Sequence, residues 1–331
     1  MFIALGSIGR LPNLAQLLFP LSFTNPLSSR NQVSFEFQSI PGFFLQSDPY
    51  TNPDEFDVYG PNSSFGLIER NSSERWRKFQ RKIQNLTQNQ PTGVNHKVIF
   101  IARHGEGFHN VAEAQYGTPL WDCHWSTMMG DGNLTWGPDS RLTNLGRRQV
   151  NKARDAWKRE ISEMIPIPQA FISSPLSRAI ETMSITDVWK YSPAAPLVIE
   201  HWRENIGLHT CDKRRSKTEI LGDFPFVKFE DKFEEDDIYW TKNLQETSAQ
   251  LNIRIKKALT DVFLDPSTAS LTYISITAHS GVISSLLEVT GHRPYPTDTG
   301  GMIPLVIRAN RISPTRPPAP GPSATKPPCA A

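Results

Sequence analysis

The stretch Lys97-Val-Ile-Phe-Ile-Ala-Arg-His-Gly-Glu106 decides the fold class, because it joins a short apolar run to a group of reactive side chains. Residues 97–102 are almost all apolar, which is typical of a strand buried on both faces of a parallel sheet. Similar strand-like runs follow at 170–174, 196–200 and 271–278. The sequence therefore predicts several short strands that are covered on both faces.

Helical patterns alternate with these runs. Helices are expected at 145–161, from about 176, at 254–263 and at 281–289, and a short amphipathic helix at 76–86. Alternation of strands and helices favours a mostly parallel sheet with helices on both faces. We therefore predict an α/β fold, specifically a three-layer α/β/α sandwich.

The composition and net charge of the chain bear on its partners and on whether it spans a membrane. The chain has 331 residues, 38% hydrophobic and 21% charged, with a formal net charge of +2. A nearly balanced charge favours neither nucleic acid nor a membrane surface as partner. No run of 18 apolar residues occurs, so no transmembrane helix is expected.

The chain divides by composition into four parts. Residues 1–30 are apolar but interrupted by polar residues and prolines, so a poorly defined N-terminus is expected and a signal peptide is not favoured. Residues 31–95 read as an extension packing on a main domain at 96–310. The Pro-rich residues 311–331 are expected to be disordered.

The cysteines are Cys123, Cys211 and Cys329. An odd number of widely spaced cysteines is no disulfide framework and fits a reducing compartment, although one bridge stays open. A cytoplasmic location is therefore expected, with secretion as the less favoured alternative.

Reactive side chains follow the predicted strands. The ends of strands in an α/β sheet are where ligands bind. The candidates, in chain order, are Arg103, His104, Asn110, Arg178, Glu204, His279 and Ser280. Two histidines, two arginines and a carboxylate are thus expected on one rim of the sheet.

This set suits phosphoryl transfer. The planar guanidinium group of arginine can donate two hydrogen bonds to phosphate oxygens. The glycine at 105 lets the backbone approach the same oxygens. A histidine can accept the phosphoryl group, and a nearby carboxylic acid can protonate the leaving oxygen and later activate water. No metal-ligand set is visible, so neither a metal nor another cofactor is expected. The expected partner is a small phosphorylated molecule.

The motifs resemble those of the histidine phosphatase superfamily, the phosphoglycerate mutase-like family of branch 1. Arg103-His-Gly-Glu106 looks like its signature, and Asn110 matches its phosphate-pocket asparagine. Residues 139–149 are similar to its D-x-x-L-T-x-x-G-x-x-Q helix start, and 174–182 to its second-arginine motif. His279-Ser-Gly matches the motif of its second histidine. The sequence outside these motifs resembles that of fungal phosphomutase-like proteins.

The resemblance implies a phosphoglycerate mutase-like fold and a role for each residue. His104 is the phosphoacceptor, Glu204 is the proton donor, and the phosphate ligands are Arg103, Asn110, Arg178, His279 and Ser280. True mutases continue the acid motif as E-R-H-Y-G, whereas Glu204 is followed by Asn205-Ile-Gly207. This departure favours hydrolysis and leaves Glu106 and Glu200 as rivals for the acid.

Alternatives remain open. One alternative to hydrolysis is a phosphomutase, which returns the phosphoryl group to a substrate. The other is a phosphate-binding module without catalytic activity. Two metal sites are further candidates: zinc bound by Cys123-His124 or by His209 and Cys211, and magnesium bound at 234–237. Ordinary surface or packing roles are favoured for all of these residues. The basic run 213–215 could bind substrate.

Overall fold

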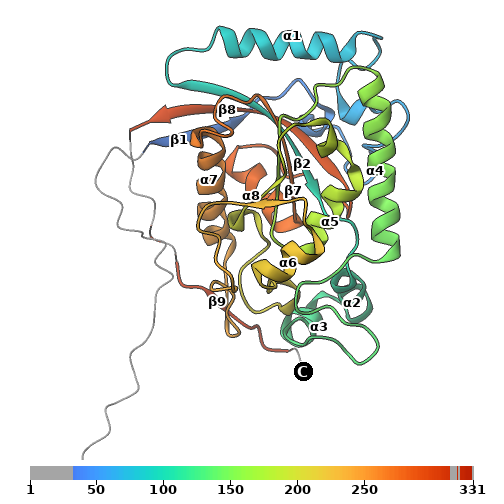
Figure 1. Cartoon of the computed structure of the whole chain (residues 1–331), viewed down its shortest axis with the longest axis vertical. Helices are drawn as coiled ribbons and strands as arrows, with labels where there is room; N and C mark the ends of the chain where they lie inside the picture. Colours follow the sequence, from blue (N-terminus) through green and yellow to red (C-terminus); the bar gives the residue numbers. More distant parts are fainter. Residues whose placement is uncertain (1–32, 314–318, 320, 330–331) are drawn as a thin grey trace, which may run out of the picture. The chain divides into compact units, whose positions relative to one another are not determined.

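The structure is a computed structural model that describes residues 33–313, 319 and 321–329. From Val33 onward the chain forms one compact unit, shown in Figure 1. The expectation of a poorly defined N-terminus at residues 1–30 lies outside the described residues.

A mixed sheet forms the middle layer. In the described residues its strands have the order β1-β8-β2-β7-β3-β4-β5. Strands β2, β7, β3, β4 and β5 run parallel to one another. Strand β8 pairs antiparallel with β2, and β1 pairs antiparallel with β8 at the edge of the sheet. The bounds are β1 Ser34–Ser39, β2 Val94–Arg103, β3 Ala170–Ser173, β4 Leu197–Val198, β5 Lys228–Phe229, β7 Tyr273–Ala278 and β8 Met302–Ile312.

Helices cover both faces of this sheet. The described α-helices are α1 Arg75–Gln88, α2 Phe108–Tyr116, α3 Thr118–Cys123, α4 Asn144–Ser162, α5 Ser177–Thr186, α6 Lys217–Asp223, α7 Ser248–Leu264 and α8 Ser280–Val289, of which α2 and α3 pack in a separate small cluster. Ile99 and Ile101 of β2 pack with α7 and α8, whereas Val98 and Phe100 pack with α1, α4 and α5. Neighbouring residues of one strand thus enter two cores, and the predicted three-layer α/β/α sandwich is confirmed.

The antiparallel edge was missed from the sequence. Strand β1 lies in the segment that we assigned to an extension, yet it pairs with β8 from Ser34 to Ser39. Its register places Phe35 and Phe37 in the core with Phe263 of α7. Strand β8 runs to Ile312, beyond the expected domain end at 310. Pairing between segments so distant in sequence leaves no local signal that propensity can detect.

The register of three strands brings their carboxyl ends level. Arg103 at the end of β2 is opposite Ala278 of β7, and Ser173 of β3 is opposite Thr277. The next residues continue the ladder, because the His104 N–H donates to the carbonyl of Ala278 at 3.1 Å. The residues that follow β2, β7 and β3 therefore meet at one rim, where ligands bind in sheets of this kind.

Residues 321–329 of the C-terminal tail form a strand pair and a disulfide, so the expectation of a disordered tail is wrong for them. Residues 314–318, 320, 330 and 331 lie outside the described residues. Ala324–Thr325 form β9, which pairs antiparallel with β6, Leu244–Gln245. Nearby, the amide nitrogen of Gln250 donates to the carbonyl of Gly321 at 2.9 Å. Prolines remove backbone donors but leave carbonyls free, so a Pro-rich segment can still be held along a protein surface.

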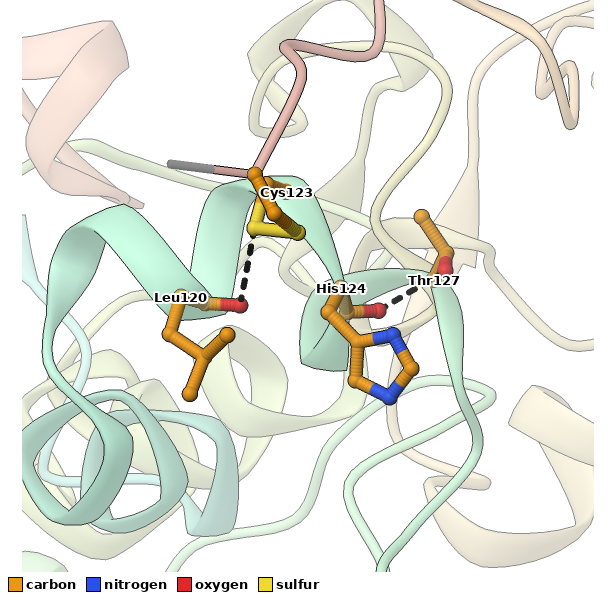
Figure 2. Close-up of a disulfide and its surroundings, with 5 residues drawn as sticks. Leu120, Cys123, His124 and Thr127 are labelled. Atoms are coloured by element: carbon orange, nitrogen blue, oxygen red, sulfur yellow. Dashed lines mark hydrogen bonds between the residues drawn. A yellow bond between two sulfur atoms is a disulfide. The ribbon is translucent and has the colours of Figure 1, made fainter. Parts of the chain in front are cut away.

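A disulfide joins the end of this tail to α3. Cys329 is bonded to Cys123, the last residue of α3, and Figure 2 shows this bridge beside Leu120 and His124. Cys211 is a free, buried cysteine. The single bridge that the sequence left open is therefore present. Because disulfides persist in oxidising compartments, the bridge weighs against the cytoplasmic location, and the compartment stays a prediction.

A helix that crosses a membrane must be long and apolar, and the described helices are mostly short or carry charged faces. None combines the length and the apolar character that a crossing requires.

Candidate active site

His104 lies directly after β2, and its ring is 2% exposed. Its Nδ1 is 2.7 Å from the carbonyl oxygen of Gly105. A carbonyl only accepts hydrogen bonds, so the ring proton belongs on Nδ1 and the lone pair on Nε2. Burial, and then the Arg178 charge, lower the pKa of His104 well below its usual value. The ring is therefore neutral and presents a nucleophilic nitrogen.

Arg178 lies at the start of α5 and is aimed at this nitrogen. Its Nε is 3.2 Å from Nε2 of His104. Its Nη1 donates to the carbonyl of Cys211 at 2.8 Å, and its Nη2 to the Asp212 carboxylate at 2.6 Å. Each terminal nitrogen still carries one further N–H. The guanidinium is thus fixed in orientation and retains donors for a bound anion.

His279 and Arg103 complete the rim. The His279 ring lies 5.1 Å from that of His104, and its Nε2 is 2.7 Å from the hydroxyl of Ser174. Burial, with Arg178 as the second cause, lowers the pKa of His279 well below its usual value. Arg103 donates from Nη1 to the carbonyl of Thr297 at 2.8 Å.

Unpaired nitrogens gather around His104. Among the described residues, Nε of Arg103, Nδ1 of His279 and Nδ1 of His109 are buried without a hydrogen-bond partner. Buried polar groups normally have partners, so three such groups near one histidine indicate a site for an oxygen-rich ligand. The His109 ring lies 5.3 Å from that of His104.

Glu204 is the carboxylate that the sequence predicted as the acid of this site. Its Oε2 accepts the Gly281 N–H at the start of α8, and its Oε1 accepts the Asn205 N–H, both at 3.2 Å. A Cβ at position 281 would collide with this carboxylate, so the glycine permits the approach. Burial, followed by the Asp212 charge, raises the pKa of Glu204, against the Gly281 N–H that lowers it. A raised pKa suits a proton donor at neutral pH.

The two rival carboxylates are engaged elsewhere. Glu106 accepts the hydroxyl proton of Thr143, with 2.5 Å between the oxygens. Glu200 forms buried ion pairs with Arg203 at 2.7 Å and with Arg214 at 2.8 Å. Glu204, in contrast, forms no ion pair within 4.0 Å among the described residues. The geometry therefore favours Glu204 as the acid.

Asn110 and Ser280 lie at helix starts near the rim. The amide oxygen of Asn110 accepts the Gly107 N–H at 3.0 Å, which leaves its amide nitrogen to donate elsewhere. Ser280 is the half-buried first residue of α8, directly after His279. Both positions are compatible with the predicted phosphate contacts, and their roles stay predictions.

Sequence reasoning missed two residues of the site. His109 could have been suspected, because it lies one position before Asn110 on the same helix start. Asp212 carried no such signal. It follows Cys211 in a short 3-10 helix, Thr210–Asp212, and its pairing with Arg178 spans 34 residues of sequence.

The proposed metal ligands do not fit a metal. Ligand atoms of His209, Cys211 and Asp212 lie within 4.8 Å of one another. However, Asp212 is paired with the Arg178 guanidinium, and burial raises the pKa of the Cys211 thiol well above its usual value. A protonated thiol and an adjacent cation oppose Zn²⁺. Cys123 is in the disulfide, and Asp237 of the 234–237 cluster is paired with Arg203 at 2.7 Å.

Comparison with known proteins gives consistent matches. The family model described as "Histidine phosphatase superfamily (branch 1)" matches residues 123–297. A "Probable phosphoglycerate mutase" of Arthroderma benhamiae is 39% identical over 82% of this chain and 84% of its own length. "Phosphomutase-like protein 3" of Candida albicans is 33% identical over 82% and 80%. A solved mycobacterial glucosyl-3-phosphoglycerate phosphatase is 17% identical, covering 66% of this chain and 100% of its own, with a TM-score of 0.38.

Proposed function

Because this chain belongs to branch 1 of the histidine phosphatase superfamily, we propose that it is a metal-independent phosphatase that hydrolyses a small phosphomonoester through phosphorylated His104. One observation carries the proposal. A neutral histidine with its lone pair on Nε2 lies beside the N–H groups of Arg178 and the unpaired Nδ1 of His279. This arrangement supplies a nucleophile and donors for phosphate oxygens together.

In the first step Nε2 of His104 attacks phosphorus, and the bond from phosphorus to the ester oxygen breaks. Protonated Glu204 gives its proton to the departing oxygen, so an alcohol leaves. The Nδ1 proton stays on the ring, bonded to Gly105. Arg103, Arg178 and His279 donate to the non-reacting phosphate oxygens, with Asn110 and Ser280 as further proposed contacts.

In the second step water attacks phosphorus on the opposite side from His104. The Glu204 carboxylate accepts a proton from that water, the bond from nitrogen to phosphorus breaks, and inorganic phosphate forms. His104 regains its lone pair and Glu204 its proton, so the cycle closes without an external acid, base or metal ion.

The test is phosphate release from p-nitrophenyl phosphate and a panel of metabolite phosphates in EDTA. We expect turnover by the wild-type chain and a loss of at least about a thousandfold in His104→Ala, as removal of a covalent nucleophile causes. Activity that needs added Mg²⁺ or Zn²⁺, or that survives in His104→Ala, would contradict the proposal.

A phosphomutase is the second candidate, because relatives carry phosphoglycerate mutase in their names. The same phosphorylated His104 would then return its group to a substrate hydroxyl. Interconversion of 3- and 2-phosphoglycerate without phosphate release would establish this reaction. A silent binding module is disfavoured, since His104, Arg178 and His279 are all present and adjacent.

A further inference from the structure

A carboxylate lies inside the proposed phosphate site. Asp212 pairs with Arg178 at 2.6 Å, and the two side chains are 4% and 1% exposed. A buried carboxylate repels a phosphate group that approaches the same arginine. Its presence there is unexpected, because an uncharged acceptor could hold Arg178 without opposing the ligand.

We propose that Asp212 is a positioning residue with a second effect: it aims Arg178 at His104 and also weakens the hold of the site on phosphate, so that the product leaves. The inference rests on the proposed phosphatase function. Asp212 touches neither the nucleophile nor the leaving group in this scheme and acts through Arg178 and Glu204.

The positioning effect follows from the bonds of the guanidinium. Asp212 and the carbonyl of Cys211 hold its two terminal nitrogens, both from the 3-10 helix Thr210–Asp212. With two adjacent anchors the guanidinium plane cannot rotate, and Nε stays 3.2 Å from Nε2 of His104. Loss of the Asp212 oxygen would remove one anchor and leave a buried N–H unpaired.

The second effect follows from the charges of the site. Arg103 and Arg178 are its fixed cations. Burial is the main cause of the lowered pKa of His104, His109 and His279, so these three rings are neutral. The Cys211 thiol is protonated, and His209 lies 4.0 Å from Asp212.

Asp212 offsets part of the positive charge of the two guanidinium groups from within hydrogen-bond distance of Arg178. Other carboxylates also act on them, Asp139 on Arg178 and both Asp298 and Glu113 on Arg103. A phosphate dianion is then attracted less strongly than by two uncompensated arginines. A hydrolase benefits from this, because tight binding of free phosphate would limit its turnover.

Asp212 also affects the pKa of Glu204, the proposed acid. Its charge is the second cause, after burial, of the raised pKa of Glu204, and the Gly281 N–H and Arg178 oppose it. Removing the Asp212 charge should lower the pKa of Glu204. The acid would then lose its proton at a lower pH, and the high-pH limb of kcat/KM would move to lower pH.

The experiment compares Asp212→Asn with the wild-type chain. Asparagine keeps an oxygen for Arg178 and removes the charge. We expect inorganic phosphate, measured by calorimetry and as a competitive inhibitor, to bind about tenfold more tightly, and the high-pH limb to shift downward. The control is Asp122→Asn, a half-exposed aspartate 3.8 Å from His209, which should change neither quantity.

Unchanged or weaker phosphate binding in Asp212→Asn would overturn the proposal. The calorimetric comparison needs no turnover, so it reports on Asp212 even if the wild-type chain proves inactive on every substrate. If Asp212→Asn fails to fold, Asp212→Glu keeps the charge and moves the oxygen by one methylene. It should lower kcat about tenfold and leave the high-pH limb in place, and a shifted limb would count against the proposal.

Discussion

At the scale of single residues, protonation is set by burial and by a few hydrogen bonds. The Gly105 carbonyl fixes which nitrogen of His104 carries the proton, and burial keeps that ring neutral. Burial has the opposite consequence for Glu204, whose pKa it raises. Desolvation disfavours the charged form in both cases, so burial in one site lowers the pKa of the histidine and raises the pKa of the carboxyl group.

The first prediction concerns this acid. Since the reaction needs protonated Glu204, kcat/KM should fall as pH rises through its raised pKa. Glu204→Gln should abolish that limb and reduce kcat on an alkyl phosphate about 100- to 10,000-fold. The loss should be smaller on p-nitrophenyl phosphate, whose leaving group needs less protonation. Glu106→Gln is the control and should retain the limb, and a Glu204→Gln enzyme with an unchanged pH profile would exclude this role.

At the scale of elements, the start of α5 is held by one buried aspartate. Oδ1 of Asp139 accepts the N–H of Ser177 at 2.7 Å, its Oδ2 accepts the hydroxyl of Ser177, and Nε of Arg215 donates to the same oxygen at 3.1 Å. Arg178 is the next residue along the helix. Asp139 therefore helps to fix the position of Arg178, through the backbone and side chain of Ser177.

The second prediction tests this anchor. Asp139→Ala leaves Nε of Arg215 and the backbone N–H of Ser177 without their acceptor, while Asp223 still pairs with Arg215 at 2.8 Å. The free energy of unfolding should therefore fall by about 2 kcal/mol in urea titrations. KM should rise as Arg178 loses its fixed position. The exposed Asp155→Ala is the matched control and should change stability by less than about 0.5 kcal/mol. Equal stability of the two variants would show that Asp139 is no anchor.

At the scale of the whole molecule, the C-terminal tail links two segments that pack beside the 207–212 loop. Its β9 pairs with β6, and β6 in turn contacts Gly207 through Gln245. Its Cys329 is bonded to α3, where Trp121 packs against His209 at 6.1 Å between rings. Segments on both sides of the 207–212 loop are thus linked through residues 321–329.

The third prediction follows from this bridge, which closes a loop of 206 residues. Reduction should lower the free energy of unfolding by about 2–4 kcal/mol, because the unfolded chain is no longer cross-linked. Cys329→Ser should be equally destabilised and insensitive to dithiothreitol. Thiol titration of the unreduced, unfolded chain should find Cys211 alone, and three reactive thiols would show that the bridge does not form.

The sequence by itself determined four of the five parallel strands, β2, β3, β4 and β7, and the residues that follow them, whereas β5 was not predicted. Apolar runs such as 97–102 and the motif at Arg103-His104-Gly105 are local, and each strand end carries its side chain to the rim whatever the distant chain does. The helices α1, α4, α5, α7 and α8 were predicted for the same reason, although α7 begins at Ser248, six residues before the predicted start at 254. Its first turn is set by the capping residue Thr247 rather than by apolar spacing. The shorter helices α2, α3 and α6 were not predicted.

Only the tertiary structure decided the partners of those residues. The pairing of Asp212 with Arg178, the disulfide between Cys123 and Cys329, and the β1–β8 edge each join segments with no shared local pattern. Such contacts form because the folded chain excludes water and leaves each buried charge or strand edge one available partner. The proposal of Glu204 over Glu106 and Glu200 rests on the same kind of contact, because the fold pairs Glu106 with Thr143 and Glu200 with Arg203.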